Sequence, residues 1–126
     1  MKVFNGTPHN IVLYSERDVI LGENKKYYLA DDSPAQKLVI EPNQALRVTY
    51  TQTSDSLDVN GFNVCIVKPT VQHIDPLPEG YDMYIVSVQY LLALRELNLD
   101  TSNVYTVGPT VLNKEDKIVG SLHLRQ

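Results

Sequence analysis

Short apolar and aromatic runs, bounded by Gly, Pro, Asn, Asp and Ser, occupy the first half of the chain. Runs of this length and composition are typical of β-strands. Ala45–Gln52 also alternates apolar and polar side chains, which predicts a strand with one apolar face. The runs that we interpret as strands in this half are Ile11–Tyr14, Val19–Leu21, Lys25–Ala30, Lys37–Glu41, Ala45–Gln52 and Phe62–Lys68.

Turn-forming residues predict how these strands are connected. Ser15–Asp18 predicts a hairpin between the first two runs, and Asn60-Gly61 predicts a tight turn. The prolines within Pro69–Tyr81 indicate a stiff connector instead of a regular element. The expected turns and connectors are Ser15–Asp18, Asp31–Pro34, Pro42–Gln44, Thr53–Gly61 and Pro69–Tyr81.

The pattern changes to a helical one at Tyr84–Asn98, where no Gly or Pro interrupts the run and good helix formers predominate. Asp82 stands close to its start, where a carboxylate favours the positive end of a helix dipole. The apolar residues spread around most of the helical circumference, so this helix needs cover on more than one side. A small single sheet covers only one side, and we therefore predict that a second copy of the chain covers another. A monomer wrapped by its own loops is the alternative.

Strand character resumes after the helix. We interpret Val104–Val107, Thr110–Asn113 and Lys117–Leu124 as strands, with Asn113–Asp116 as the last turn. The predicted fold class is α+β: a mainly antiparallel β-sheet of short strands with one long helix in the C-terminal half, packed at a homo-oligomer interface. Residues 1–126 are expected to form a single domain, because 126 residues is a usual domain length.

The net charge and the cysteine content indicate which cellular compartment and which classes of binding partner to expect. The net charge of −4 argues against a nucleic acid polymer as partner, because a phosphate backbone requires a clustered basic face. Cys65 is the lone cysteine, so it forms no internal disulfide and indicates a reducing, intracellular setting. The N-terminus lacks an apolar signal core and no stretch is long enough to span a membrane. We therefore expect a cytosolic protein without membrane contact.

Asn5-Gly6-Thr7-Pro8-His9 interrupts what otherwise reads as one strand from Val3 to Tyr14. Gly6 permits a bulge, and Pro8 is tolerated there because it lacks an N–H group. Thr7 and His9 would then point to the same face. Two interpretations stay open: an edge that blocks aggregation of strands, and a segment that lines a ligand site.

No catalytic or metal-binding constellation stands out. His9, His73 and His123 lack the spacing of metal ligands, so we expect no metal and no cofactor. Cys65 is interpreted as a core residue, because no nucleophile motif surrounds it. A nucleotide hydrolase or lyase that uses His9 or His73 as acid or base is the enzymatic alternative.

Phosphate-binding glycine loops are absent too, so side chains and turn or helix amides would have to hold any phosphate. Arg47 and Arg125 suit bidentate phosphate contacts, although a solvated guanidinium is the default interpretation of each.

Several motifs together resemble a family of small bacteriophage proteins. N-G-T-P-H at residues 5–9 resembles that family's N-L-T-P-H, and E-P-N-Q-A-L-R-V at 41–48 resembles its proline turn followed by Ala-x-Arg-Val. Y-I-V-S at 84–87 resembles the opening of its helix, and K-E-D-K-I-V-G at 114–120 resembles its closing turn and strand. The chain thus resembles the first family of Thoeris anti-defence proteins, phage sponges that sequester cyclic ADP-ribose isomers made by bacterial TIR enzymes.

The resemblance implies a protein that binds its ligand without turnover, in the cytoplasm of the infected bacterial host. It implies a homo-oligomer, a dimer or a hexamer, with pockets between protomers, and in some members a second site for cyclic oligonucleotides. An aromatic side chain would stack on adenine and an Arg would hold phosphate. The expected ligand-binding residues, from the resemblance and from the arginine argument, are Thr7, His9, Arg47, Tyr84, Ser87, Asn113 and Arg125.

The chain also departs from the family pattern. Gly6 replaces an apolar residue, and Leu112 stands where a basic residue is expected, which weakens the case for phosphate recognition by the closing turn. A small phage structural or assembly protein, whose edge strand and apolar helix make only protein contacts, is the alternative function.

Overall fold

The computed structural model of the chain describes residues 1–30 and 36–126. These residues contain one 3-10 turn, η1 (Glu16–Asp18), and one α-helix, α1 (Val88–Glu96). The strand end predicted at Asp31–Pro34 lies outside the described residues. The strands are β1 (Val3–Asn5), β2 (Ile11–Tyr14), β3 (Val19–Leu21), β4 (Tyr27–Leu29), β5 (Lys37–Ile40), β6 (Val48–Val59), β7 (Phe62–Ile74), β8 (Met83–Ile85), β9 (Val104–Val107), β10 (Thr110–Leu112), β11 (Ile118–Ser121) and β12 (Leu124–Arg125).

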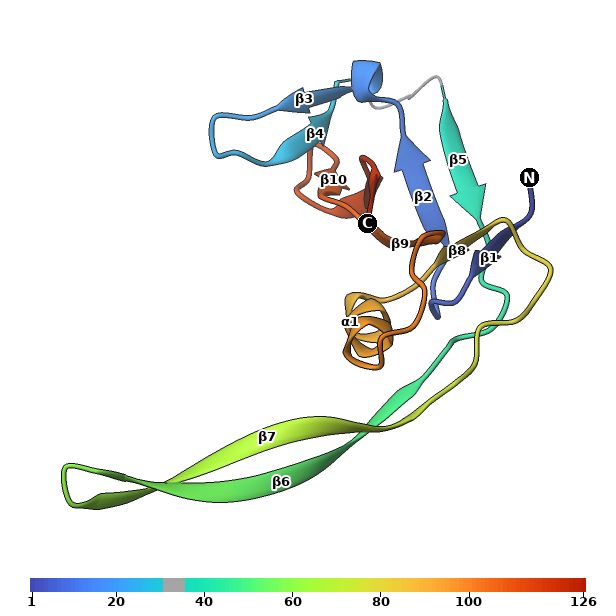
Figure 1. Cartoon of the computed structure of the whole chain (residues 1–126). Coiled ribbons are helices and arrows are strands. Elements are labelled where there is room, and N and C mark those ends of the chain that lie inside the picture. The colour runs from blue at the N-terminus through green and yellow to red at the C-terminus, as the bar shows by residue number, and fades with distance from the viewer. Residues whose placement is uncertain (31–35) are drawn as a thin grey trace.

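The strands form three sheets (Figure 1). One has the strand order β1-β8-β9-β12, a second has the order β3-β4-β10-β11-β2-β5, and β6 pairs with β7 alone. Both larger sheets are mixed: β8 is parallel to β1 and β9, and β11 is parallel to β2, whereas β2 and β5 are antiparallel. The predicted single sheet is therefore wrong, whereas antiparallel pairing predominates, with five of the nine strand pairs among the described residues.

The predicted long helix over Tyr84–Asn98 is also wrong. Its first residues belong to β8, and α1 has only nine residues. Aromatic and β-branched side chains at Tyr84–Val86 favour an extended backbone between two neighbouring strands. Ser87 then begins the helix, because its Oγ accepts a hydrogen bond from the Tyr90 N–H at 3.2 Å. The fold is mostly β, with one short helix.

The end of α1 is fixed by Asn98, whose φ of 57° lies in the left-handed region. The N–H groups of Asn98 and Leu99 donate to the carbonyls of Arg95 and Leu94, the pairing of a Schellman motif. The buried residues of the helix, Tyr90, Leu91, Ala93 and Leu94, lie on one side. The other apolar side chains of the helix, Val88 and Leu92, are exposed, and the homo-oligomer that we expected to cover them stays a prediction.

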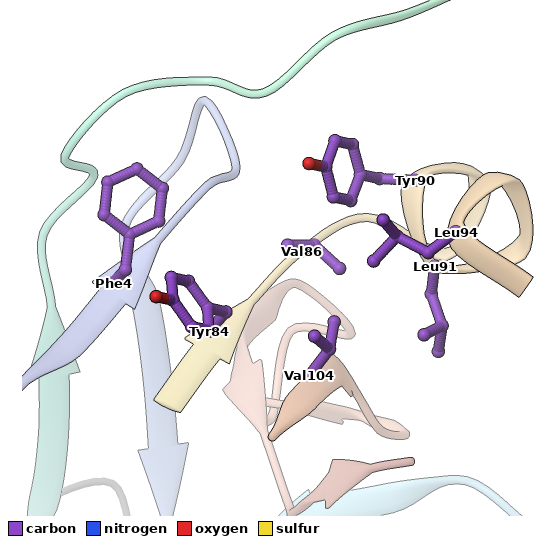
Figure 2. Close-up of a cluster of buried hydrophobic side chains, with 7 residues drawn as sticks. All are labelled: Phe4, Tyr84, Val86, Tyr90, Leu91, Leu94 and Val104. Carbon is purple, nitrogen blue, oxygen red and sulfur yellow. The ribbon is translucent and has the colours of Figure 1, made fainter. Parts of the chain in front are cut away.

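The main core lies between α1 and the sheet that contains β1, β8 and β9. Phe4 and Tyr84 project toward each other from adjacent strands, and side chains of α1 close the other side (Figure 2). The Phe4 ring meets the Tyr81 ring edge-on, with a centroid distance of 5.0 Å. The buried members of this cluster are Phe4, Tyr84, Val86, Tyr90, Leu91, Leu94 and Val104.

A long two-stranded arm, β6 and β7, projects from this body (Figure 1). The Asn60-Gly61 turn is confirmed: both residues have positive φ, 51° and 88°, as a type I′ hairpin turn requires. The segments around it were wrongly predicted, because Thr53–Val59 continues β6 and Pro69–Ile74 continues β7. Polar residues are tolerated there since both faces of the ribbon meet solvent. Cys65, expected in the core, is exposed on this arm.

The predicted hairpin through Ser15–Asp18 is wrong as well. β2 pairs with β5 and β11, whereas β3 pairs with β4. The residues of η1 form a 3-10 turn that turns the chain from one pair to the other. Local turn signals identified a change of direction but not which strands pair, because pairing depends on segments far away in sequence.

Candidate functional site

A pocket of about 620 Å³ lies where the two larger sheets meet. Four parts of the chain form it: the loop between β1 and β2 with the first residues of β2, the start of α1, the end of β9, and β11. Its walls are mainly apolar, and neither carboxylates nor Lys or Arg side chains line it. The lining residues are Thr7, Pro8, His9, Asn10, Ile11, Val12, Val86, Ser87, Val88, Thr106, Val107, Ile118, Val119, Gly120 and Ser121.

Asn5 explains why Asn5-Gly6-Thr7-Pro8-His9 interrupts the strand pattern. The loop leaves one sheet at β1 and enters another at β2, so Val3–Tyr14 is two strands and not one. Asn5 is fully buried. Its amide donates to the carbonyls of His9, at 2.9 Å, and Ile40, at 3.0 Å, while its Oδ1 accepts from the N–H and hydroxyl of Thr7. One side chain thus shapes the loop that forms one wall of the pocket.

Gly6 serves close packing, not a bulge. Among the described glycines, only Gly61 and Gly80 have positive φ. A Cβ on Gly6 would lie 2.9 Å from Leu46 Cδ1, and the Leu46 N–H donates to the Gly6 carbonyl at 2.9 Å. The predicted bulge is therefore wrong, and the small residue is needed because the chain at Leu46 runs against β1.

The start of α1 provides hydrogen-bond donors at the pocket. Ser87 and Val88 line it, and Ser87 is the N-cap. The first N–H groups of a helix have no partner within the helix and carry partial positive charge, so a helix start favours anions. Here the Tyr90 N–H is already satisfied by Ser87 Oγ. The N–H group of Val88, which lines the pocket, and that of the following residue, Gln89, are therefore the helix donors nearest to a bound anion.

Two hydroxyls add to these donors. Thr106 and Ser121 line the pocket and are only 5% and 8% exposed. Neither hydroxyl makes a hydrogen bond to another described side chain or backbone group, and neither oxygen is fully enclosed, so both are accessible from the pocket. Buried hydroxyls usually find a partner, so both have hydrogen-bonding capacity for a molecule in the pocket.

The structure brings three of the seven predicted ligand-binding residues together: Thr7, His9 and Ser87 line the pocket. The Thr7 hydroxyl is already bonded to Asn5 Oδ1 at 2.7 Å. Tyr84 lies outside the pocket, in the core, and its hydroxyl donates to the Pro78 carbonyl. A side chain that is 6% exposed offers no open ring face to an adenine.

The remaining three predicted residues lie elsewhere. Arg47 is exposed at the base of the arm, where its N–H donates to Asp75 Oδ2 at 2.8 Å. Asn113 organises the turn before β11 by accepting hydrogen bonds from the N–H groups of Glu115 and Lys117. Arg125 is exposed on β12, which pairs with β9.

A smaller pocket of about 460 Å³ lies beside Asn113, with Lys37, Lys114 and Glu115 in its lining. Its two lysines outnumber its one carboxylate, so its charge suits a phosphate, but it is smaller than the pocket at the start of α1.

Sequence reasoning missed Asn5, Thr106 and Ser121. Asn5 directly precedes Gly6 in the interrupted strand, and an Asn in a turn signals side-chain bonds to nearby backbone, which could have identified it. Thr106 and Ser121 come from strands that the sequence does not show to be neighbours of the loop, so no local signal could have grouped them.

Within residues 1–30 and 36–126, no cluster of three or more His, Cys, Asp or Glu side chains could hold a metal ion. None of the helices in that part of the chain is long and apolar enough to cross a membrane. Comparison with protein-family models, characterised proteins and solved structures found no match. Functional inference therefore depends on the geometry described above.

Proposed function

We propose that the chain is a binding protein that sequesters a cyclic ADP-ribose-type nucleotide in the 620 Å³ pocket without degrading it. The observation that supports this is one cavity with apolar walls, a helix start and two buried hydroxyls, and no carboxylate in its lining. Ligand pockets of small molecules span about 300–1,000 Å³ and combine apolar walls with a few placed polar groups. The cytoplasm of the infected host is the setting that this function requires.

The polar groups suggest how the ligand lies. Its phosphates are held by the N–H groups of Val88 and Gln89 and by the hydroxyls of Ser121 and Thr106. The absence of a lining carboxylate matters because a negative group would repel the phosphates. The base and ribose lie against apolar residues such as Val107 and Val119, and His9 lies at the edge as a further donor.

Binding is tested by calorimetric titration with cyclic ADP-ribose isomers, with linear ADP-ribose as the comparison ligand. Thr106→Val keeps the side-chain shape and removes the hydroxyl, so we expect it to weaken binding by about tenfold or more. We expect the same loss of affinity for Ser121→Ala. Arg17→Ala, on a surface away from the pocket, is the matched control and should leave affinity unchanged. Equal affinity of all four proteins, or no binding by any, would count against the site.

Turnover is tested separately. Protein saturated with the nucleotide is heat-denatured and the supernatant is analysed by chromatography. A sponge releases its ligand chemically unchanged, whereas recovery of a cleaved product would assign the enzymatic alternative, in which His9 acts as acid or base.

A second candidate function, an assembly protein that makes only protein contacts, is favoured by the exposed arm of β6 and β7. Thermal unfolding separates the two functions: a ligand at a hundred times its dissociation constant adds about 2.7 kcal/mol to the free energy of unfolding. The absence of any nucleotide-induced shift would support the assembly protein.

A further inference from the structure

A second pocket adjoins the nucleotide pocket, by which we mean the 620 Å³ pocket at the start of α1. It measures about 460 Å³ and is formed by the turn between β3 and β4, by β10, and by the chain at Asp116 and Ile118. Lys25 and Lys26 line it, so we call it the lysine pocket. It shares no lining residue with the pocket beside Asn113.

Two stretches of the chain join the nucleotide pocket to the lysine pocket. Ile118, at the start of β11, lines both. Val107, at the end of β9, lines the first, and Pro109, two residues later, lines the second. Ile118 is 69% exposed, so it forms an open boundary and not a wall between the two pockets. A ligand that covers Ile118 can therefore occupy both.

The two pockets differ in charge. No Lys or Arg lines the nucleotide pocket, whereas Lys25 and Lys26 both line the lysine pocket. Neither ammonium group forms an ion pair with a residue in the described part of the chain. Asp116 is the one carboxylate in the described lining, and its Oδ1 accepts a hydrogen bond from the Tyr28 hydroxyl at 2.8 Å. Two cations against one anion leave a positive charge that attracts a phosphate.

Hydrogen bonds hold the turn that carries the two lysines. The Lys26 N–H donates to Asn24 Oδ1 at 3.1 Å, and the Lys26 carbonyl accepts from the Gly22 N–H at 2.8 Å. The Asn24 amide donates to the Tyr28 hydroxyl at 3.1 Å, which in turn donates to Asp116. The turn is thus tied to the chain before β11, on the other side of the lysine pocket. A backbone that is already ordered lowers the cost of ordering on binding.

The length of β11 relates the lysine pocket to the proposed position of the ligand. Ser121 is placed at a phosphate of the ligand, and Val119 at its base and ribose. Ile118 lies three residues from Ser121 along the strand, which is roughly 10 Å. A nucleoside spans a distance of this order. The end of the nucleoside that points away from the pyrophosphate therefore reaches Ile118 and, beyond it, the two lysines.

We infer that the site selects a cyclic ADP-ribose-type nucleotide that carries an additional phosphate on a ribose hydroxyl, and that Lys25 and Lys26 bind this phosphate. The inference rests on the proposed function and specifies its ligand class. A phosphate monoester carries a charge of about −1.5 to −2 at pH 7, which two ammonium groups balance. Charge-assisted hydrogen bonds are roughly twice as strong as neutral ones, so the added phosphate should raise the affinity about tenfold or more.

The first test is calorimetric titration with cyclic ADP-ribose and with cyclic ADP-ribose 2′-phosphate. Both ligands carry the same pyrophosphate, so the ratio of their dissociation constants isolates the added phosphate. The wild type should bind the 2′-phosphate about tenfold or more tightly than the parent. Lys25→Gln combined with Lys26→Gln removes both charges and keeps extended side chains, and its ratio should fall to within about threefold of one. Lys68→Gln, on the exposed arm, is the matched control and should keep the wild-type ratio.

The second test varies the charge at the same two positions. Lys25→Arg combined with Lys26→Arg keeps both charges, so the preference for the 2′-phosphate should persist. Lys26→Glu places a second carboxylate in the lining with Asp116, so this variant should bind the 2′-phosphate more weakly than the parent. Higher ionic strength should reduce the wild-type ratio, because both lysines are exposed and salt screens their charge. Thermal unfolding of each variant verifies the fold.

The outcomes separate this inference from the proposed function. A wild type that binds cyclic ADP-ribose but gains no affinity from the 2′-phosphate overturns the inference and leaves the proposed function intact. A preference that persists in the double glutamine variant also overturns it, because other groups must then hold the phosphate. If neither nucleotide binds the wild type, the proposed function fails, and the inference fails with it.

Discussion

The body and the arm of this protein have similar apolar residues but use them in opposite ways. Leu94 in α1 is 2% exposed and belongs to the main core, whereas Leu57 in β6 is 53% exposed and touches no core. Every residue from 49 to 70 is exposed. A two-stranded hairpin is marginal by itself in water, so the arm owes its shape to the ladder and to its firmly held base. Apolar side chains at its tip therefore contribute little to the stability of the fold.

The largest expected contrast comes from equal truncations in the two regions. Leu94→Ala should lower the free energy of unfolding by about 2–5 kcal/mol, because it removes buried methyl groups and leaves a cavity. Leu57→Ala should change it by less than about 0.5 kcal/mol in dilute, monomeric protein. Urea denaturation measures both. A cost above about 1.5 kcal/mol for Leu57→Ala would mean that the arm is packed against something within the chain.

The contrast also explains which parts of the fold the sequence could predict. Val104–Val107 was predicted with the bounds of β9. The Asn60-Gly61 turn was predicted because Asn-Gly strongly favours a two-residue hairpin turn. The helix was predicted too long because the apolar residues Tyr84 and Ile85 suit a helix as well as a strand, and only pairing with the parallel neighbours β1 and β9 makes them part of a strand. The length of the arm was missed: Thr53–Val59 was interpreted as a turn because it is mostly polar, and Pro69–Ile74 as part of a connector because prolines follow it.

The candidate site was predictable only where it is local in sequence. Thr7 and His9 come from one loop, and Ser87 follows from its place before a helix. Arg47 and Arg125 were chosen for their chemistry, but their strands carry them to other surfaces. Thr106 and Ser121 reach the pocket through the pairing of β9 and β11 with strands far away in sequence, which no single-sequence pattern contains.

A second contrast between body and arm is expected at alkaline pH. Burial and the nearby Asp75 raise the pKa of Tyr90 from 10.0 to about 12. The unfolded chain loses this proton at lower pH than the folded chain, so the stabilisation is complete below pH 10 and is lost as the pH rises toward 12. The free energy of unfolding should fall on the order of 2 kcal/mol across this window.

Denaturant titrations between pH 9 and pH 12 measure this loss. Tyr90→Phe removes the titrating hydroxyl, and its curve should lack this part of the decline. A chain with a shortened arm keeps Tyr90 in the core and should retain the decline. If the free energy of unfolding of Tyr90→Phe fell as steeply with pH as that of the wild type, another titrating group would be responsible for the loss.

Two glycines give a smaller contrast. Gly6→Ala places a Cβ 2.9 Å from Leu46 Cδ1 in the body, and we expect a loss of about 1–2 kcal/mol in the free energy of unfolding. Gly61→Ala instead strains a residue with a φ of 88° in open space, at a cost of about 1–2 kcal/mol that stays local to the arm. Amide hydrogen exchange should show faster exchange at the tip for Gly61→Ala alone. Equal loss of global stability in both variants would contradict the separation of arm and body.

The smallest expected effect is that of removing the outer arm altogether. Deleting Ser54–Val59 and Phe62–Val67 joins Thr53 to Asn60-Gly61 and then to Lys68, which are already cross-strand partners. Because an even number of residues leaves each strand, every remaining side chain keeps its face and the turn keeps its register. The free energy of unfolding in dilute solution should change by less than about 0.5 kcal/mol, since none of the deleted residues is buried. The nucleotide affinity should be unchanged, because none of the deleted residues lines the pocket. A destabilised body would show that the arm stabilises the core through its base, and would remove the distinction between the two regions.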